Sequence, residues 1–335
     1  MSSYRLSFEE PVREIDRLIE DLRKPGPDGK RNNTPKLKRL ERKKMQLLKD
    51  IYSNLTPWQR VQVARHPERP TTADYIRLIV NDFQELHGDR LYGDDKAMIA
   101  GLGTIDGVRL AVIGHVKGRT TPEKIRCNFG MAHPEGYRKA LRIMKLAEKC
   151  HLPVLSLIDT AGAYPGVGAE ERGQAYAIAE NILEMAMLRT PTVGVILGEG
   201  GSGGALGIGL VDRLMMLRYA YYSVISPEGC AGILWRSGEM AEEAAAALKI
   251  GAGDLLKLGL IDSIIEEPLG GAHRDHDQAA QNARLAIVAN LKGLRRLKPN
   301  RLLEKRQQKY RLMGVFNEGG RLVEQVQLRS AAVEA

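Results

Sequence analysis

The hydrophobic pattern near the start of the chain predicts two amphipathic helices. Over residues 8–23 the apolar positions recur at the spacing of one helical face; they are Phe8, Val12, Ile15, Leu18, Ile19 and Leu22. Residues 24–35 contain three prolines and two glycines and interrupt this pattern. A second, strongly basic helix is predicted over residues 36–52. We expect a helical hairpin outside the main domain, with a role in packing or dimerisation rather than in chemistry.

The next strong pattern is a β-hairpin followed by a helix. Two apolar runs within residues 97–116 flank Asp106-Gly107, a pair suited to a two-residue turn with positive φ. Residues 134–149 then show helical periodicity, and Pro134 fits the first position of a helix. These elements predict an antiparallel pair of strands followed in the chain by a helix.

The centre of the chain repeats one arrangement three times: an apolar strand, a loop of small residues and a helix. The strands are predicted at 153–159, 191–197 and 221–226, and the helices begin near Glu170, near Gly204 and after Pro227. Strands without polar alternation, each followed by a helix, indicate an α/β domain with a buried sheet. A basic helical segment follows from about residue 283.

Composition and charge narrow the class of protein. The 335 residues include 35 glycines and only 5% aromatic residues, which favours an aliphatic core with many tight loops. The three cysteines form no C-x-x-C pair, so we expect no zinc ribbon and no metal on this chain. The charged N-terminal stretch does not resemble a signal peptide, and no apolar run is long enough to span a membrane. The expected location is the cytoplasm.

The net charge of +9 is concentrated at the two ends of the chain. Residues 1–70 carry 17 Lys/Arg against 10 Asp/Glu, and residues 272–335 carry 13 against 6. Such a distribution fits either solvated helix faces or an anionic partner, such as a CoA phosphate, a nucleic acid or an acidic protein. Charge alone does not distinguish these readings.

The loop Gly200–Ala205 is the strongest candidate for chemistry. Its four glycines leave the backbone nearly bare where a strand passes into a helix, so amide N–H groups can approach a ligand closely. The unpaired amides and the dipole at a helix N-terminus favour negative charge. The loop is therefore suited to an oxyanion hole or a phosphate cradle, although tight strand–helix packing would also explain some of its glycines.

A hydrolase is the rival reading of the same loop. Gly200, Ser202 and Gly204 fit the G-x-S-x-G pattern of a nucleophile elbow, and His273 and His276 lie later in the chain, after acidic residues such as Asp254 and Asp262. No lysine followed by Ser or Thr closes the glycine run, which excludes a Walker phosphate loop.

Another glycine-rich corner, Asp159–Gly168, lies one strand–helix unit earlier in the chain. We call it the first corner, and the loop that begins at Gly200 the second corner. A hydrolase elbow does not require such a loop. Two corners on neighbouring strands can direct amides at one oxygen atom from two sides, and such donors stabilise an enolate-like oxyanion. A side chain at Gly203 or Gly204 would crowd this approach, and we expect the backbone there to favour glycine.

Long strings around these corners resemble the carboxyltransferase alpha subunits of bacterial-type acetyl-CoA carboxylases, within the crotonase-like superfamily. They occur in order over about half of the chain and are much more specific than a lone glycine motif. The strings span Ala64–Ile76, Arg126–Arg142, Ile158–Gln174, Gly198–Gly209, Tyr222–Trp235 and Glu267–Arg274.

The resemblance implies a crotonase-like spiral of repeated ββα units with an N-terminal helical extension. It divides the chain into a helical region (1–70), a carboxyltransferase domain (71–300) and a basic tail (301–335). It also implies an oxyanion hole for biotin made by the backbone amides of Gly166, Val167, Gly203 and Gly204. Substrate-binding positions are then expected at Gly162, Tyr164, Gly200, Gly201 and Ser202, and Ser202 becomes a turn residue.

The resemblance further implies transfer of a carboxyl group from carboxybiotin to acetyl-CoA, which gives malonyl-CoA in the first committed step of fatty acid biosynthesis. Biotin would arrive on a separate carrier protein. The implied partners are a beta subunit with a zinc ribbon, the biotin carboxyl carrier protein and biotin carboxylase, in a complex with two alpha and two beta chains. A second oxyanion hole would belong to the beta subunit.

Charged and histidine side chains outside the corners have simpler expected roles. We expect His115, His133 and His151 to be structural, because no ligand pattern surrounds them. Lys117 and Arg119 follow a buried strand and suit either an anionic ligand or a solvated turn.

Overall fold

A mixed eight-stranded sheet forms the centre of the molecule. The computed structural model describes residues 4, 6–24, 34–318 and 321–324. Seven strands lie in the order β1-β2-β3-β4-β5-β6-β8, and β7 pairs with the end of β5. The strands are β1 (Asn81–Glu85), β2 (Met98–Ile105), β3 (Val108–His115), β4 (Val154–Thr160), β5 (Thr192–Gly201), β6 (Arg213–Leu217), β7 (Tyr221–Ser223) and β8 (Ser263–Ile265).

The direction of the strands changes at β3. The strands β1, β2 and β3 are antiparallel neighbours, whereas β3, β4, β5, β6 and β8 run parallel. The predicted hairpin is confirmed: β2 pairs with β3, and Asp106 and Gly107 at the turn have φ values of 49° and 74°. Both strands of the parallel pair β4 and β5 are buried along their whole length.

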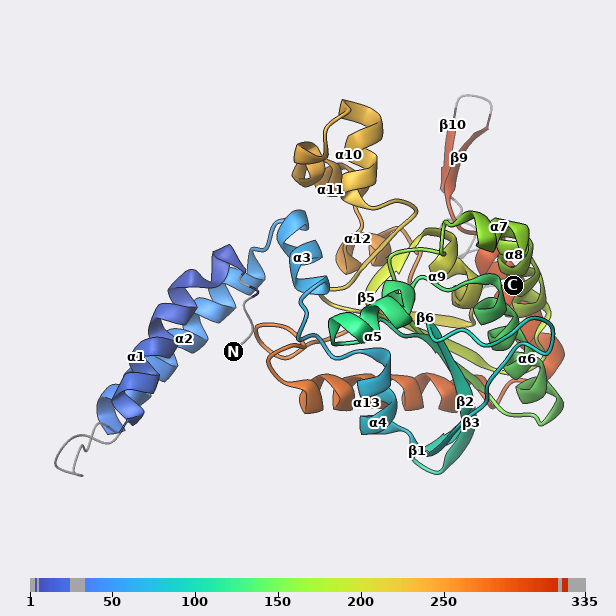
Figure 1. The fold of residues 1–335 in the computed structure, drawn as a ribbon, viewed down its shortest axis with the longest axis horizontal. Coiled ribbons are helices and arrows are strands. Elements are labelled where there is room, and N and C mark those ends of the chain that lie inside the picture. Colours follow the sequence, from blue (N-terminus) through green and yellow to red (C-terminus); the bar gives the residue numbers. More distant parts are fainter. Residues whose placement is uncertain (1–3, 5, 25–33, 319–320, 325–335) are drawn as a thin grey trace.

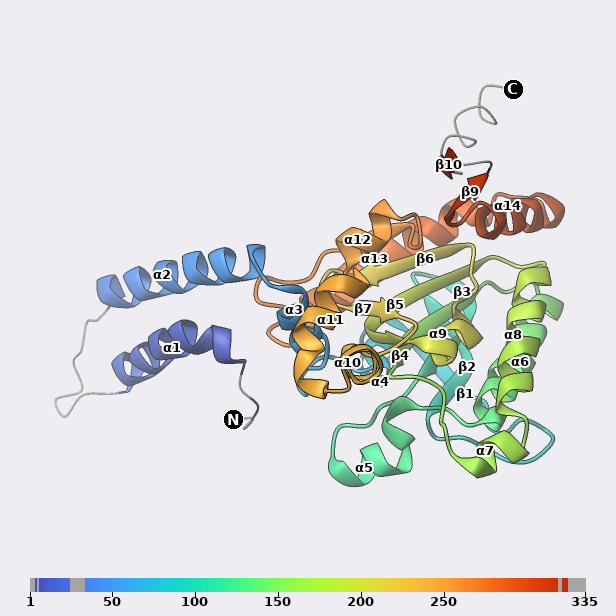
Figure 2. The ribbon, with the colours of Figure 1, turned by 90° about the horizontal axis from the view of Figure 1, so that it is seen from above.

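Helices cover both faces of this sheet (Figures 1 and 2). Helix α6 (Pro134–Lys149) packs on β2 and β3, and α9 (Ser202–Gly209) packs on β4 and β5, with α8 (Gln174–Met187) against both helices. On the opposite face α13 (His276–Leu294) packs beside α4 (Thr72–Ile79). The bounds of α6 are those that the sequence periodicity predicted, residues 134–149.

Shorter helices connect these layers. They are α3 (Pro57–Ala64), α5 (Thr121–Arg126), α7 (Val167–Glu171), α10 (Pro227–Trp235), α11 (Ala241–Leu248) and α12 (Ala252–Lys257), with 3-10 turns at Ser7–Glu9, Asn128–Gly130 and Gly238–Met240. Two predicted helix starts were displaced. The helix expected from Glu170 is two helices, because Gly173 has a φ of 80° and separates α7 from α8. The helix expected from Gly204 already begins at Ser202.

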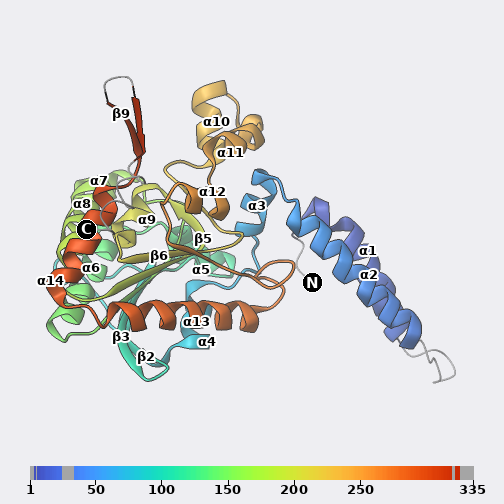
Figure 3. The same ribbon diagram turned by 180° about the vertical axis from the view of Figure 1, so that it is seen from behind.

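The predicted N-terminal helical hairpin extends from one side of the domain (Figures 1 and 3). It consists of α1 (Glu10–Arg23) and α2 (Thr34–Ser53); residues 25–33 lie outside the described residues. At its base the Tyr52 hydroxyl donates to Glu9 at 2.6 Å, and Arg274 pairs with the same carboxylate at 2.8 Å. A small apolar cluster around Leu48 and Val63 surrounds this contact and joins the hairpin to the domain.

The C-terminal segment is anchored by a buried arginine. Helix α14 (Pro299–Arg311) packs against α8. Arg306 is 1% exposed; its guanidinium pairs with Asp212 at 2.8 Å and donates to the carbonyl oxygens of Met185, Leu188 and Thr190. After α14, β9 (Val315–Glu318) pairs with β10 (Arg321–Glu324). Among the described helices none is long and apolar enough to cross a bilayer.

Candidate functional site

The two glycine corners lie side by side at one edge of the sheet. The first, Asp159–Gly168, begins at the end of β4, and the second, Gly200–Gly204, includes the end of β5 and the start of α9. Because β4 and β5 are neighbouring parallel strands, their carboxyl ends meet at the same edge. Ligands of open α/β sheets commonly bind at such an edge.

The backbones of the two corners are in direct contact. A β-carbon added to Gly201 would lie 2.0 Å from the Ala161 carbonyl oxygen, and one added to Gly204 would lie 2.5 Å from the Gly162 carbonyl carbon. Gly203 is different, since its β-carbon would lie 3.6 Å from the nearest atom, a methyl group of Ile178. Close approach of two main chains therefore requires glycine at positions 201 and 204 but not at 203.

The expectation that φ favours glycine at positions 203 and 204 was wrong. Both residues lie within α9 and have no positive φ, whereas Ser202 has a φ of 48°. The chain makes its strained turn at Ser202, where the helix starts, so the later glycines can be helical. Glycine is required at position 204 because a β-carbon there would collide with the Gly162 main chain.

The second corner presents unpaired amides. Gly201 is the N-cap of α9 and is also paired with Ser223 in the sheet, so the free amides at the start of the helix are those of Ser202, Gly203 and Gly204, which have no carbonyl partner within the helix. Among the described residues no side chain caps this end. The helix dipole adds partial positive charge at the same place. This end of α9 is therefore suited to an oxyanion.

The first corner is shaped by its own hydrogen bonds. The Gly162 amide donates to Thr160 Oγ1 at 3.1 Å, and the Thr160 hydroxyl donates to the Gly162 carbonyl at 2.7 Å. The Tyr164 amide donates to the Ala132 carbonyl at 3.1 Å, and the Tyr164 ring stacks on His133 with a centroid separation of 4.3 Å. The main-chain groups of Gly162 and Tyr164 thus hold the loop, and the Tyr164 ring is half-buried.

Gly166 and Val167 lie further along this corner. Gly166 is the N-cap of α7 and Val167 is its first residue, and within the described ranges no side chain caps the helix. Val167 is 71% exposed. In the first corner, the residues that contact the second corner directly are Ala161, Gly162 and Ala163. Gly166 instead lies against the Tyr164 ring of its own corner.

A buried ion cluster lies where both corners begin. The Lys117 ammonium pairs with Asp159 at 2.9 Å and with Glu199, and Arg65 pairs with Glu199 at 2.7 Å. Burial acts to raise the pKa of Glu199, but Lys117 and Arg65 outweigh burial and lower the pKa to about 2. The position of Lys117 after a buried strand was noticed in the sequence, but its partners come from β4 and β5, and no sequence pattern identified them. Arg119, in contrast, pairs with Asp74 on α4.

The same cluster reaches α10. Arg65 Nη1 donates to Glu228 at 2.5 Å, and Arg65 Nη2 donates to the Tyr221 hydroxyl at 3.0 Å. That hydroxyl in turn donates to Glu199 at 2.6 Å. Burial and the neighbouring Glu199 raise the pKa of Tyr221, so the phenol stays protonated. No sequence pattern identified Arg65, Tyr221 and Glu228 as a set, although all lie in or beside the strings quoted above.

The geometry gives little support to the hypothesis that Ser202 is a hydrolase nucleophile with a histidine partner. Ser202 has the positive φ of a nucleophile elbow and is exposed. The two candidate histidines are engaged elsewhere: His273 stacks on His66 at 4.0 Å, and His276 bonds to the Glu68 carbonyl at 2.7 Å. Burial and then the Lys117 charge lower the pKa of the fully buried His115 to about 3, so it is neutral at pH 7.

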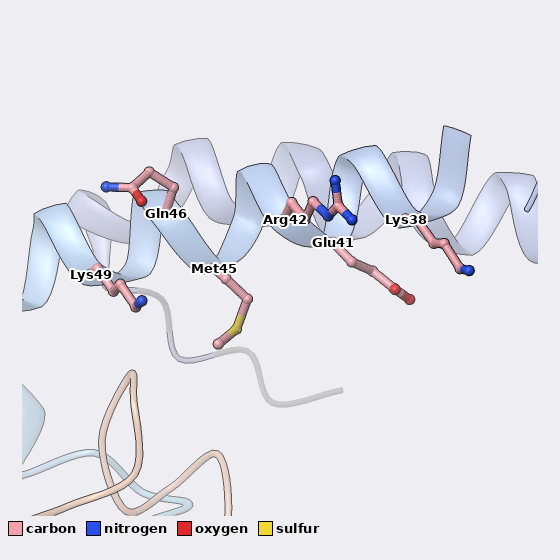
Figure 4. A pocket seen from close by; sticks show the side chains of 6 residues that line it. All are labelled: Lys38, Glu41, Arg42, Met45, Gln46 and Lys49. Carbon is pink, nitrogen blue, oxygen red and sulfur yellow. The ribbon is translucent and has the colours of Figure 1, made fainter. Parts of the chain in front are cut away.

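Two surface hollows lie on the helical hairpin. One of about 440 Å³ runs along α2, and its lining is polar or charged except for Met45 (Figure 4). A larger groove of about 990 Å³ lies between the hairpin and the domain, beside His66 and His273. Its lining charges of both signs are largely paired, as in Lys44–Asp16 at 2.5 Å. Within the described ranges no three His, Cys, Asp or Glu side chains are grouped to hold a metal ion.

The mixed sheet and the paired corners define a protein with the crotonase-like carboxyltransferase fold. Among solved structures, transcarboxylase 12S with methylmalonyl-coenzyme A and methylmalonic acid bound has a TM-score of 0.54 at 18% identity, covering 65% of this chain and 40% of that chain. A Pseudomonas malonate decarboxylase hetero-tetramer in complex with coenzyme A also has a TM-score of 0.54, at 17% identity, covering 72% and 92%.

Sequence relatives identify the family. The profile described as acetyl co-enzyme A carboxylase carboxyltransferase-like matches residues 5–314. The acetyl-coenzyme A carboxylase carboxyl transferase subunit alpha of Methylococcus capsulatus is 54% identical over 93% of this chain and 98% of its own length. That of Coxiella burnetii is 57% identical over 91% of this chain and 96% of its own. The chain belongs to the family of acetyl-CoA carboxylase carboxyltransferase alpha subunits, as the sequence strings predicted.

Proposed function

We propose that this chain transfers a carboxyl group to acetyl-CoA, giving malonyl-CoA, as one half of a carboxyltransferase in the first committed step of fatty acid biosynthesis. The family membership supports the reaction. The observation that carries the site is the uncapped start of α9, where a glycine main chain packs directly on the corner that follows β4. This arrangement offers fixed amide donors to an oxygen atom that gains negative charge.

Each residue of the corners has a proposed role. The amides of Gly203 and Gly204 donate to the oxyanion, and those of Gly166 and Val167 complete the hole from the first corner. Gly200, Gly201 and Ser202 keep the approach to these amides free of large side chains, and the first-corner residues Gly162 and Tyr164 form the facing wall. The fixed donors need no reorganisation as charge develops, which is why such holes accelerate reactions.

Biotin, attached to a separate carrier protein, is the proposed source of the carboxyl group; when bound it supplies an activated carboxyl and a ureido oxygen. The residues present fit this group, because the amides at the start of α9 have neither a helical partner nor a capping side chain among the described residues. At Gly203 an added β-carbon would make only ordinary van der Waals contact, 3.6 Å from Ile178, so the main chain is not crowded there. The chain's own part is to bind and orient the ureido oxygen through these amides.

Membership of an alpha-subunit family implies a beta subunit. We infer that it carries the zinc ribbon and the second oxyanion hole, and that two alpha and two beta chains assemble with the biotin carboxyl carrier protein and biotin carboxylase in the cytoplasm. Exposed apolar side chains on and beside α10 support a protein partner at the edge of the sheet that holds the corners; Val224, Ile233 and Leu234 are 76%, 72% and 64% exposed.

The experiment that tests this function uses the purified chain with and without a zinc-ribbon beta subunit. Transfer of a carboxyl group from malonyl-CoA to free biotin is the reverse reaction and needs no carrier protein. We expect the two subunits to co-purify and only the complex to transfer the carboxyl group. Robust transfer by the isolated chain would contradict a shared site.

A further inference from the structure

The β4–β5 ladder is irregular at the point where the two corners begin. Regular pairing stops at Ile158 with Ile196 and resumes at Thr160 with Gly200. Between these two pairs, one residue of β4 faces three residues of β5, so regular strand pairing does not fix the relative position of the two chains there. Asp159 and Glu199 both lie inside this interval.

Side chains replace the missing ladder bonds. The Glu199 amide donates to Asp159 Oδ1 at 2.9 Å, and Lys117 bridges the two carboxylates from the end of β3, bonding Asp159 Oδ1 at 2.9 Å and Glu199 Oε2. The side chains are only 19%, 10% and 9% exposed for Lys117, Asp159 and Glu199. One ammonium thus ties the ends of three adjacent strands together.

The electrostatics keep this bridge charged. Burial acts to lower the pKa of Lys117, but Asp159 and Glu199 outweigh burial and raise the pKa. Buried charged partners attract strongly because little water screens them, and loss of one partner leaves the other uncompensated. Glu199 has a second cation, Arg65, whereas no other ammonium or guanidinium is bonded to Asp159 in the described structure.

We propose that Lys117 is a positioning residue for the two glycine corners. Asp159 is the first residue of the first corner and Glu199 immediately precedes the second, so the bridge sets how the corners lie against each other. The tolerance is small, because a single β-carbon at Gly201 would already lie 2.0 Å from the Ala161 carbonyl oxygen. The functional consequence rests on the proposed oxyanion hole; the positioning itself does not.

Two variants of Lys117 and one control test the proposal. Lys117→Met removes the bridge, and Lys117→Met/Asp159→Asn removes it without leaving an unpaired carboxylate, since the amide side chain introduced at position 159 keeps an oxygen for the Glu199 amide. The control is Lys309→Met. Lys309 is also little exposed, at 13%, and pairs with Asp262 at 2.5 Å, but it lies on α14 rather than beside the corners.

Amide hydrogen exchange of the purified chain reports on positioning without any activity. In the double variant we expect peptides covering residues 158–166 and 196–209 to exchange at least about fivefold faster than in the wild type. The Lys309→Met variant should leave the exchange of these peptides unchanged, even if its melting temperature falls by as much as that of the double variant. Unchanged exchange at both corners in the folded double variant would overturn the proposal.

Kinetics of the complex with the beta subunit provide the second readout. We expect the double variant to lose about tenfold or more in kcat, with the KM for malonyl-CoA within about twofold of the wild type, because donors displaced from the oxyanion lose transition-state stabilisation. An unchanged kcat would also overturn the positioning role in catalysis. If the wild-type complex transferred no carboxyl group, the proposed function would fail, while the exchange experiment would still decide the role of Lys117.

Discussion

Gly204 packs on the carbonyl carbon of Gly162 so closely that a β-carbon on Gly204 would lie 2.5 Å from it. The start of α9 is thereby fixed against the corner that follows β4. The contact joins two segments that are far apart in the chain, and it determines where the unpaired amides of α9 point. Catalytic donors act only when they are held at the position where charge develops.

Ser202 should not be a nucleophile, although it occupies an exposed turn with a φ of 48°. Its hydroxyl has no role in a hole made of main-chain amides, so Ser202→Ala should lower kcat by less than about tenfold. A serine-directed phosphonate should leave the wild-type chain unlabelled, as judged by intact mass. Stoichiometric labelling at Ser202 would support a hydrolase instead.

Arg306 should be essential for the stability of the fold. It is 1% exposed and pairs with Asp212, so Arg306→Met would leave a buried carboxylate without its cation. Breaking one half of a buried pair costs about 3–5 kcal/mol in the free energy of unfolding. The matched control is Arg301→Met on the same helix, because the Arg301 side chain is 61% exposed and its loss should cost less than about 1 kcal/mol. Urea titration measures both; equal effects would contradict this role.

Asp89 should make stability depend on acid pH. Its Oδ1 accepts from the amides of Leu91, Tyr92 and Gly93 at 2.8–3.0 Å, and Arg138 donates to Oδ2 at 2.8 Å. Burial acts to raise the pKa of Asp89, but these donors outweigh burial and lower the pKa to about 2. A carboxyl whose pKa is lower in the folded state stabilises the protein above its unfolded pKa of about 3.9, and this contribution is lost as pH falls towards 2.

The Asp89→Asn variant tests this sign. At pH 7 it should lose about 2 kcal/mol relative to the wild type, and the difference should shrink between about pH 4 and pH 2. The exposed Asp82 provides the control, since Asp82→Asn should change the free energy of unfolding little at any pH. A wild-type advantage that grows on acidification would contradict the assignment.

Sequence patterns predicted the elements whose signals are local. Pro134 starts α6 where the helical periodicity began, and the turn at Asp106-Gly107 joins β2 to β3. The glycine corners were found because bare backbone at a strand–helix junction is itself a local signal. The crotonase-like fold and the family followed from the long strings, not from these patterns.

The remaining features depend on contacts between distant segments. Lys117 looked equally like a solvated turn residue, because its partners Asp159 and Glu199 come from strands that only the folded sheet brings together. Arg306 lies in a basic segment that was interpreted as a tail, yet it is buried against Asp212. The positive φ at Ser202 was missed because a run of glycines conceals which residue makes the turn. The division into regions 1–70, 71–300 and 301–335 stays a prediction.

The most direct test of the oxyanion corner compares Gly204→Ala with Gly203→Ala in the complex with the beta subunit. The added methyl group collides with the Gly162 main chain at position 204, whereas at position 203 its nearest neighbour is an Ile178 methyl group at 3.6 Å, an ordinary van der Waals contact. We predict that Gly204→Ala lowers the turnover of carboxyl transfer by about a hundredfold, whereas Gly203→Ala stays within about tenfold of the wild type. Both variants should still bind the beta subunit and acetyl-CoA. A Gly204→Ala complex that turns over at the wild-type rate would contradict the assignment of the oxyanion hole to this corner.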